Sequence, residues 1–300
     1  MSLPYSEFPV YVGQPNSDSV TNEKSNFLAA TDVNVSYAAS MTPKRSVVGI
    51  GVADPDPNKS IDQSNAFTFG GPLTANISFG LFLNNSVGVG EDGYSFLTGS
   101  NQDKYFPIQV GSGKFERCYL DSFSVDVQPY QPVSLQVNFT SLRPETGVAI
   151  SGDSTPYNDE HPPFDSDEVI YGHTCAVAGM STLFGNVQSQ IQYSKTFSRT
   201  PVLTLGSLAA ETALLDEVQH QMVVQATGLN EMMRYTGIGI GTTNPLPNPV
   251  TVNLTNVDGD TNFYLKSLDM TAGARVNTQS YAMAGGDTLV TTTTFTQALV

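Results

Sequence analysis

The stretch SFSVDVQPYQPVSLQVNFTSL, Ser122 to Leu142, decides the fold class of this chain. Apolar residues alternate with polar ones on both sides of the corner at 129–132, which is the pattern of two half-buried strands joined by a turn. The stretch QSYAMAGGDTLVTTTTFTQAL (279–299) has the same plan, with Gly-Gly-Asp at its corner. The sequence therefore predicts a β-hairpin in each of these two stretches.

Two earlier segments, 31–51 and 187–206, are predicted to form hairpins of the same kind, because each contains alternating apolar residues followed by a polar corner. The expected corners are 40–45 and 194–200, and the expected returning strands are 47–50 and 202–205. Further strand pattern follows each hairpin, at 73–83 and 222–240. The low content of charged residues, 14%, also suits extended structure more than surface helices.

Only one segment favours a helix. Leu208, Leu215 and Val218 lie near helical spacing after Ser207, a residue type that often caps a helix. The corresponding stretch of the first half carries Pro55 and Pro57 and cannot form the same helix. The predicted fold class is therefore all-β with a minor α contribution.

A displacement of 156 positions brings four separated segments of the chain onto each other. It aligns Tyr37 with Tyr193, Leu73 with Leu229, Ser124 with Ser280, and Phe139-Thr140 with Phe295-Thr296. Solenoid and propeller repeats have periods of about 20 to 50 residues, so this longer period predicts two whole domains of similar fold. The predicted division is an extended, proline-containing N-terminal arm at 1–16, a first domain at 17–144, an acidic linker at 145–172 and a second domain at 173–300.

The charge balance argues against a protein that binds nucleic acid by neutralising its phosphates. The net charge is −15, and only 13 of the 300 residues are Lys or Arg, whereas neutralising phosphates requires clustered basic residues. The linker at 145–172 carries seven of the 28 acidic residues and no basic one, which fits a hydrated connector. No apolar run of about 18 residues and no secretory signal is present, so we expect no membrane partner and synthesis in a cytoplasm.

No residue pattern predicts catalysis, cofactor binding or a metal site. The three histidines, His161, His173 and His220, are scattered, and His173 with Cys175 forms only an isolated pair two positions apart. Cys118 and Cys175 fall in different halves and are expected to be free thiols. The chain is therefore predicted not to be an enzyme, with no catalytic, cofactor-binding or metal-binding residues.

Acidic clusters at 54–56, 159–168 and 256–262 carry oxygen ligands, but none has the spacing of an EF-hand. The third contains Asp-Gly and is predicted to be a hairpin turn. The Asn-x-Ser/Thr triplets at Asn34, Asn76 and Asn138 are expected to be unmodified, since no secretory signal precedes them.

The closing hairpins, SFSVDVQPYQPVSLQVNFTSL and QSYAMAGGDTLVTTTTFTQAL, resemble the end of a tail tube domain of tailed bacteriophages. The opening hairpins at 31–51 and 187–206 fit the same plan, and the helix expected at 207–218 is similar to one that lies outside the sheet in that family. The prolines at 55 and 57 depart from this pattern. The resemblance covers 17–144 and 173–300.

The resemblance implies two tandem β-sandwich or half-barrel domains that join neighbouring chains into a ring-shaped β-barrel. Three duplicated chains would complete a homotrimeric ring with pseudo-sixfold symmetry, and stacked rings would form the hollow, helically assembled tail tube of the virion, built in the host cytoplasm. DNA would pass through the lumen during ejection without specific binding. The arm and outer loops would mediate stacking. The implied partners are other copies and other tail proteins: the terminator, the tape measure, the distal tail or baseplate, and a sheath if the tail contracts.

Two other interpretations remain open from the sequence. One is another phage β-sandwich virion protein, for example a baseplate, tail terminator or capsid decoration protein. The other is a two-module carbohydrate-binding protein, for which 13 Tyr and 16 Phe supply stacking rings although Trp is absent.

Overall fold

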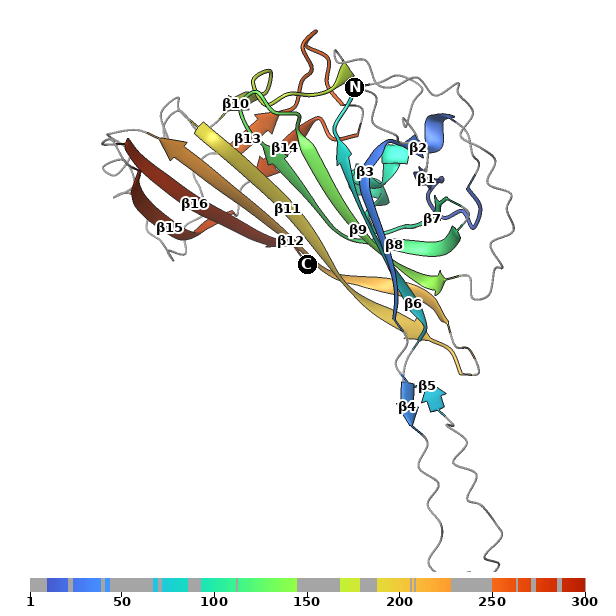
Figure 1. Ribbon diagram of the computed structural model, residues 1–300. Coiled ribbons are helices and arrows are strands. Elements are labelled where there is room, and N and C mark those ends of the chain that lie inside the picture. The colour runs from blue at the N-terminus through green and yellow to red at the C-terminus, as the bar shows by residue number, and fades with distance from the viewer. Residues whose placement is uncertain are drawn as a thin grey trace, which may run out of the picture.

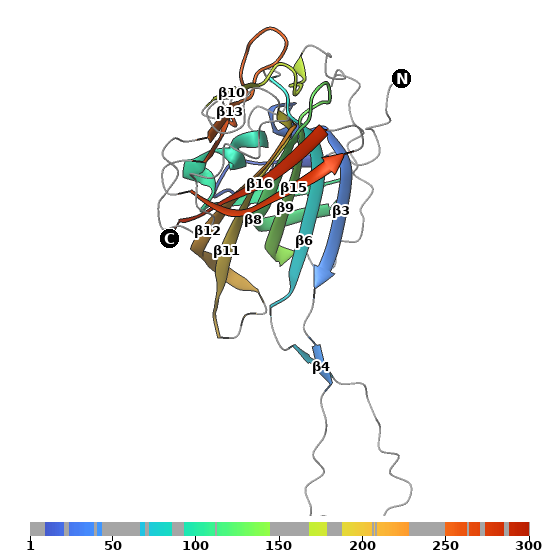
Figure 2. The ribbon, with the colours of Figure 1, turned by 90° about the vertical axis from the view of Figure 1, so that its left-hand side faces the viewer.

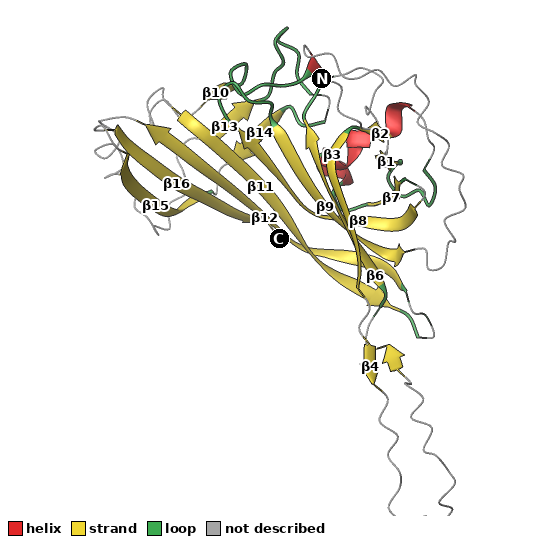
Figure 3. Ribbon diagram, in the orientation of Figure 1, coloured by secondary structure: helices red, strands yellow, loops and turns green. Residues whose placement is uncertain are grey.

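The computed structural model describes fifteen stretches of the chain: 10–20, 24–38, 41–43, 67–69, 72–85, 93–111, 113–144, 168–178, 188–205, 207, 209–227, 250–262, 264–270, 274–284 and 288–299. Nearly all of their regular structure is antiparallel strand, as the yellow arrows of Figure 3 show. The helices among these residues are three short 3-10 segments, η1 (Lys24–Asn26), η2 (Gly93–Leu97) and η3 (Gly99–Asn101). The predicted all-β class is confirmed.

Sixteen strands lie in the described residues. The first half contains β1 (Val10–Val12), β2 (Phe27–Leu28), β3 (Ala30–Ala38), β4 (Met41–Pro43), β5 (Phe67–Phe69), β6 (Thr74–Phe82), β7 (Tyr105–Val110), β8 (Gly113–Val127) and β9 (Ser134–Pro144). The second half contains β10 (Ala176–Ala178), β11 (Gln188–Leu203), β12 (Ala210–Thr227), β13 (Val250–Asn253), β14 (Ser267–Met270), β15 (Arg275–Ala284) and β16 (Thr288–Leu299).

One large sheet runs through both halves of the chain. Eight of its strands lie side by side in the order β15-β16-β12-β11-β8-β9-β6-β3, and β8 also pairs through its first part with β7, which leads to β1 and β2. β3 and β15 lie at opposite ends of this curved sheet in Figure 1. The sheet of β10, β13 and β14 and the segment with η2 lie over one face (Figures 1 and 2). The large sheet itself forms no closed barrel.

The hydrophobic core lies between the large sheet and the segments that cover this one face. Alternate residues of β6, β8 and β9 point into it, and Phe139 is fully buried at its centre. Its ring makes edge contacts with Phe96 of η2 and Phe106 of β7, at centroid distances of 5.2 and 6.4 Å, and stacks on Phe79 at 5.9 Å. The period-two alternation of the sequence therefore determines which face is buried.

The two closing hairpins are confirmed. β8 and β9 pair with Phe123 opposite Val137 and Val125 opposite Leu135. In the second half, β15 and β16 pair across the expected corner. The strand predicted at 73–83 is also confirmed as β6, whereas 228–240 lies outside the described residues.

Both predicted opening hairpins are wrong in their pairing. β3 pairs with β6, and the expected corner at 40–45 contains β4, which pairs with β5. The other expected corner, 194–200, lies inside the continuous 16-residue strand β11. The polar residues of 194–200 that suggested a corner lie on a strand with one hydrated face, where polar residues are also expected. Positions 47–50 lie outside the described residues.

The predicted helix at 207–218 is wrong, because these residues lead into β12. Ser207 accepts a hydrogen bond from the Ala209 amide and donates one to the Ala209 carbonyl, so it stabilises a turn. Leu214 is 59% exposed and Leu215 36%, so the leucines form no buried helical stripe. Pairing with β11 along its whole length supplies the hydrogen bonds of β12 and overrides local helix propensity.

The arm and the linker each contribute structure where they are described. In the arm, Val10–Val12 forms a buried strand that pairs with β7 and β2. At the end of the linker, Ile170 is fully buried and its amide donates to the Leu83 carbonyl, while its carbonyl accepts from the Val133 amide. Residues 1–9 and 145–167 lie outside the described residues.

Replacing Phe139 tests the position of the core. We expect Phe139→Ala to lower the free energy of unfolding by about 3–5 kcal/mol, because it removes an aromatic ring from a fully buried site and leaves a cavity. Urea denaturation of the purified protein measures this loss. Val257→Ala, at a side chain that is 56% exposed, is the control and should change stability by less than about 0.5 kcal/mol. Equal effects of the two variants would contradict the placement of the core.

Candidate assembly edges and the concave polar face

The order and pairing of four strands recur in the two halves of the sheet. In the first half the order is β3-β6-β9-β8, and in the second half it is β11-β12-β16-β15. In each unit the order across the sheet is the first, second, fourth and third strand along the chain. The two four-stranded units therefore share one topology.

The register of pairing recurs as well. Adding 156 to both numbers converts the β8–β9 pair Leu120–Phe139 into the β15–β16 pair Val276–Phe295. Each hairpin also has a register shift at the same place, between Leu120 and Ser122 in the first and between Val276 and Thr278 in the second. The hairpins thus agree in pairing and in their one irregularity.

The other two strands of each unit, β3 with β6 and β11 with β12, also agree in register, but with different offsets. Adding 158 in β3 and 145 in β6 converts Ala30–Leu81 into Gln188–Ala226 and Asp32–Gly80 into Gln190–Gln225, including the register shift between these pairs. The equivalent of Tyr37 is therefore Lys195, and that of Leu73 is Val218. The single ungapped displacement of 156 is correct for the closing hairpins only, because the two units differ in the length of the connections before them.

The two units meet where β11 pairs antiparallel with β8, and we call this pairing the internal seam. On its core side Tyr193 lies opposite Val125, and both are buried, at 5% and 1% exposure. On its other side Ser194 lies opposite Ser124. The ring of Phe123 packs 6.1 Å from that of Tyr193 between centroids. The seam therefore continues the hydrophobic core from one unit into the other.

The two strands at the ends of this eight-stranded array are the counterparts of the two strands of the internal seam. β3 is the counterpart of β11 and pairs on one side only, with β6; β15 is the counterpart of β8 and pairs on one side only, with β16, among the described residues. Between Val33 and Ala38, and between Thr278 and Ala282, neither edge contains a charged residue or a proline. Such devices normally protect exposed edges from pairing with another chain.

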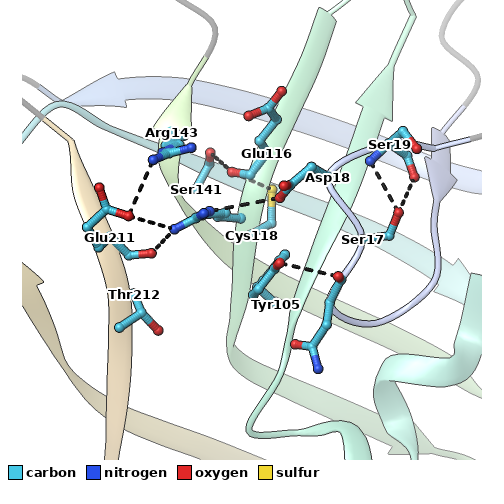
Figure 4. Close-up of polar contacts among 12 residues, drawn as sticks. Ser17, Asp18, Ser19, Tyr105, Glu116, Cys118, Ser141, Arg143, Glu211 and Thr212 are labelled. Carbon is cyan, nitrogen blue, oxygen red and sulfur yellow. Dashed lines mark hydrogen bonds and ion pairs between the residues drawn. The ribbon is translucent and has the colours of Figure 1, made fainter.

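A group of ion pairs joins the two units beside the internal seam. Glu211 of β12 lies 3.4 Å from Arg117 of β8 and 3.5 Å from Arg143 of β9. Figure 4 labels Glu211 and Arg143 and marks the ion pair between them. Arg117 also approaches Asp18 at 3.9 Å. The Tyr119 hydroxyl lies 2.8 Å from that of Thr212, so neutral groups add to the same contact. These contacts fix the end of β12 against the first unit.

A second polar group lies on the core side of β11. The Lys195 ammonium donates to the Gln102 side-chain oxygen at 2.5 Å and lies 5.5 Å from the centre of the Phe197 ring. Burial lowers the pKa of Lys195 to about 8. Burial, and then the Lys195 charge, lower the pKa of His220 to about 4, and its Nδ1 lies 3.0 Å from the Tyr193 hydroxyl. His220 is therefore neutral near pH 7 and serves as a hydrogen-bonding group of the sheet.

The face of the large sheet opposite the core is mainly polar, and we call it the polar face. One row of paired residues crosses eight strands and reads Asp32, Gly80, Gln136, Ser124, Ser194, Gln221, Thr296, Arg275. A cavity of about 400 Å³ on this face is lined from six neighbouring strands, so the face is concave. The charged residues that line it are Asp32 and Asp126. Arg275 is the only Lys or Arg that lines the adjacent cavity near β15 and β16.

The sequence-predicted candidate residues do not converge on a catalytic or metal site. Cys118 is buried and Cys175 half-buried, and both are free thiols, as expected. His173 stacks on Tyr130 at a centroid distance of 5.4 Å, far along the chain from His220 in β12. Within the described residues no group of three or more His, Cys, Asp or Glu could hold a metal ion. His161 lies outside the described residues.

The acidic cluster at 256–262 forms a turn, as predicted. The Asn256 amide donates to the Asp260 carbonyl, and Gly259 has a φ of 89°, a left-handed conformation that glycine adopts without strain. The Asn262 side-chain oxygen accepts from the amides of Tyr264 and Leu265, and its nitrogen donates to the Asn84 carbonyl. Its polar atoms are thus used within the fold. The clusters at 54–56 and 159–167 lie outside the described residues.

The features that sequence reasoning missed are the two free edges and the polar face as a whole. A signal for the face was present in the alternate Ser, Thr, Asn and Gln residues of the strands in the eight-stranded array, but it is meaningful only once the strand order is known.

Comparison with protein-family models and with curated proteins finds no match for this chain. Among the described residues no helix has the length and apolar character needed to span a bilayer.

Removing the Glu211 charge tests the ion pairs beside the internal seam. We expect Glu211→Gln to lower the free energy of unfolding of the protein by about 0.5–1 kcal/mol at low salt, since the pairs are partly exposed. The difference should nearly vanish at about 1 M salt, where screening is strong. Urea denaturation at both salt concentrations provides the measurement. Glu217→Gln, on the same strand and without an ion pair among the described residues, is the control; a salt-independent loss at Glu211 would contradict the assignment.

The lowered pKa of Lys195 predicts a specific pH dependence. Between about 8 and 10.5 the unfolded chain binds a proton at Lys195 more readily than the folded chain, so this group makes stability rise with pH in that window. We expect the stability of the wild type, relative to Lys195→Met, to increase as pH rises through about 8. Cys118 and Cys175 are present in both proteins, so the comparison of wild type with Lys195→Met cancels their own contributions to the pH dependence of stability. Parallel stability curves from pH 7 to pH 10 would show that Lys195 is not buried in this way.

Proposed function

We propose that this protein is the subunit of a tail tube of a tailed bacteriophage, a virion structural protein whose chains close into rings that stack around a DNA channel. In this proposal each chain supplies two related tube domains, formed around β3-β6-β9-β8 and β11-β12-β16-β15, and three chains make a ring with pseudo-sixfold symmetry. The protein has no catalytic role in this assembly. Its partners are other copies and other tail proteins.

The observation that carries the proposal is the relation between the internal seam and the free edges. A chain that presents the counterpart of β11 at one end of its sheet and the counterpart of β8 at the other can repeat the seam with a second copy. Such a contact is head-to-tail, and head-to-tail contacts form a closed ring when the rotation between neighbours is right. Closing the ring removes both unprotected edges.

The polar face supports the channel part of the proposal. It is concave, and its Ser, Thr, Asn and Gln side chains bind water without concentrating positive charge. DNA phosphates are held chiefly by clustered Lys and Arg, and the two cavities of this face are lined by Asp32, Asp126 and a single basic residue, Arg275, so such a lining would let DNA slide. We therefore assign the polar face to the lumen and the covered face to the outside of the ring.

Exposed apolar residues at one end of the subunit support stacking of rings. The end of the β11–β12 hairpin projects beyond β8 and β9 in Figure 1, in the same direction as β4 and β5. Its exposed apolar side chains are Val202, Leu203, Leu205, Leu214 and Leu215. Exposed apolar side chains that gather at one end of a subunit can mark a contact site, and here the proposed partner is the next ring.

One expectation from the family resemblance is not met. The helix expected at 207–218 is replaced by β12, so the proposal rests on the repeated pairing pattern, the free edges and the polar face. These observations concern assembly, and they favour a ring-forming subunit over a binding module that acts alone.

Electron microscopy tests the proposal directly. We expect purified protein, concentrated under native conditions, to give annuli and stacked tubes in negative stain, with a hollow centre. Sedimentation should show species larger than the 32.1 kDa chain. A mobility assay with duplex DNA at physiological salt should show no retention, because the lumen lacks a basic lining. Single particles of chain size at every concentration, or tight retention of DNA, would refute the tube.

A further inference from the structure

We infer that β3 of one chain pairs antiparallel with β15 of a second copy of this chain in one defined register, with Ser36 opposite Ser280 and Val35 opposite Tyr281. The inference rests on the proposed ring and specifies the contact that would close it. The register follows from the internal seam, where Ser194 lies opposite Ser124.

The counterpart positions give the register by arithmetic. Subtracting 158 from the β11 numbers gives β3, and adding 156 to the β8 numbers gives β15. The seam pair Ser194–Ser124 becomes Ser36–Ser280. All of these offsets come from pairing within each unit, so the contact between chains is not assumed in deriving them.

The side chains at the two edges are complementary in this register. On the core side the seam pairs Tyr193 with Val125, and the edges would pair Val35 with Tyr281, so the same two residue types meet with their strands exchanged. Aromatic and β-branched residues form favourable cross-strand pairs. On the polar face a serine pair occurs in both contacts. No like charges meet, since 33–38 and 278–282 contain no charged residue.

The exposure of the edge residues agrees with a contact that the single chain does not make. Tyr281 is 38% exposed, whereas its counterpart Val125 in the internal seam is 1% exposed. Val35 is only half-buried, whereas its counterpart Tyr193 is buried. Pairing with a second copy would bury both edge residues as the seam buries their counterparts. A one-residue slip would instead place Val35 opposite Ser280 or Ala282, whose side chains point to the polar face of the partner's sheet.

The Arg143–Glu211 ion pair beside the internal seam is not repeated at the edges. The counterpart of Arg143, at an offset of 156, is Leu299, which carries no charge. The contact between chains therefore relies on backbone pairing and on the side chains of the two strands. We expect it to be less sensitive to salt than the seam within the chain.

Disulfide crosslinking tests the register. Directly opposed residues of an antiparallel pair have Cα atoms about 4.5–5.5 Å apart, within disulfide reach, whereas diagonal neighbours are about 7–8 Å apart and beyond it. In a Cys175→Ser background, which removes the half-buried thiol, we expect Ser36→Cys with Ser280→Cys to lose its monomer band on mild oxidation and to form a ladder ending at a closed ring. The diagonal combination of Ser36→Cys with Ala282→Cys is the matched control and should stay monomeric on a denaturing gel.

The outcomes separate this inference from the proposed function. If the wild type forms annuli but the diagonal pair crosslinks, or the Ser36–Ser280 pair does not, the register is overturned and the tube stands. If Ser36→Cys alone crosslinks, β3 pairs with another β3 and the head-to-tail contact is refuted. A specific Ser36–Ser280 ladder without a final closed species would support the register and refute the ring.

Discussion

The antiparallel pairing of β8 with β11 is the contact on which the rest of the structure depends. It joins two four-stranded units into one sheet, continues the core through Phe123 and Tyr193, and aligns the polar residues of both units on one concave face. Backbone groups of both strands are hydrogen-bonded in the seam, and this pairing is what the outer edges of β3 and β15 lack among the described residues. The two edges are thus defined by a contact that the chain already makes once.

The closing hairpins were predictable because three signals agree in them. Alternation, strand propensity and turn chemistry all point to hairpins at 122–142 and 279–299, and residues such as Val125 and Phe139 lie buried as the alternation requires. The helix at 207–218 was mispredicted because long-range pairing with β11 decides the structure of β12, in which Leu215, one of the residues that suggested helical spacing, is exposed on a strand. The same long-range pairing made β11 continuous through a polar stretch that looked like a corner.

The candidate site was less accessible to sequence reasoning than the fold. The repeat was visible at an offset of 156, but β3 and β6 follow offsets of 158 and 145, which an ungapped comparison cannot find. Tyr37 was therefore matched with Tyr193, although its counterpart is Lys195. Which strands lie at the edges depends on strand order, and strand order is a property of contacts between residues far apart in the chain. The polar residues of the polar face were visible in the sequence, but their common surface was not.

The presence of the seam within one polypeptide has a kinetic consequence. In the proposed ring every second junction is already made when the chain folds, and its two strands are held at a high effective concentration by the connection between them. Two associations and one closure then suffice where six separate domains would need five associations and one closure, and each avoided association spares the loss of translational and rotational freedom of a free subunit. The tandem arrangement would also fix the alternation of the two domain types around the circumference, so that differences between them, such as the lengths of their outer hairpins, recur at every second position.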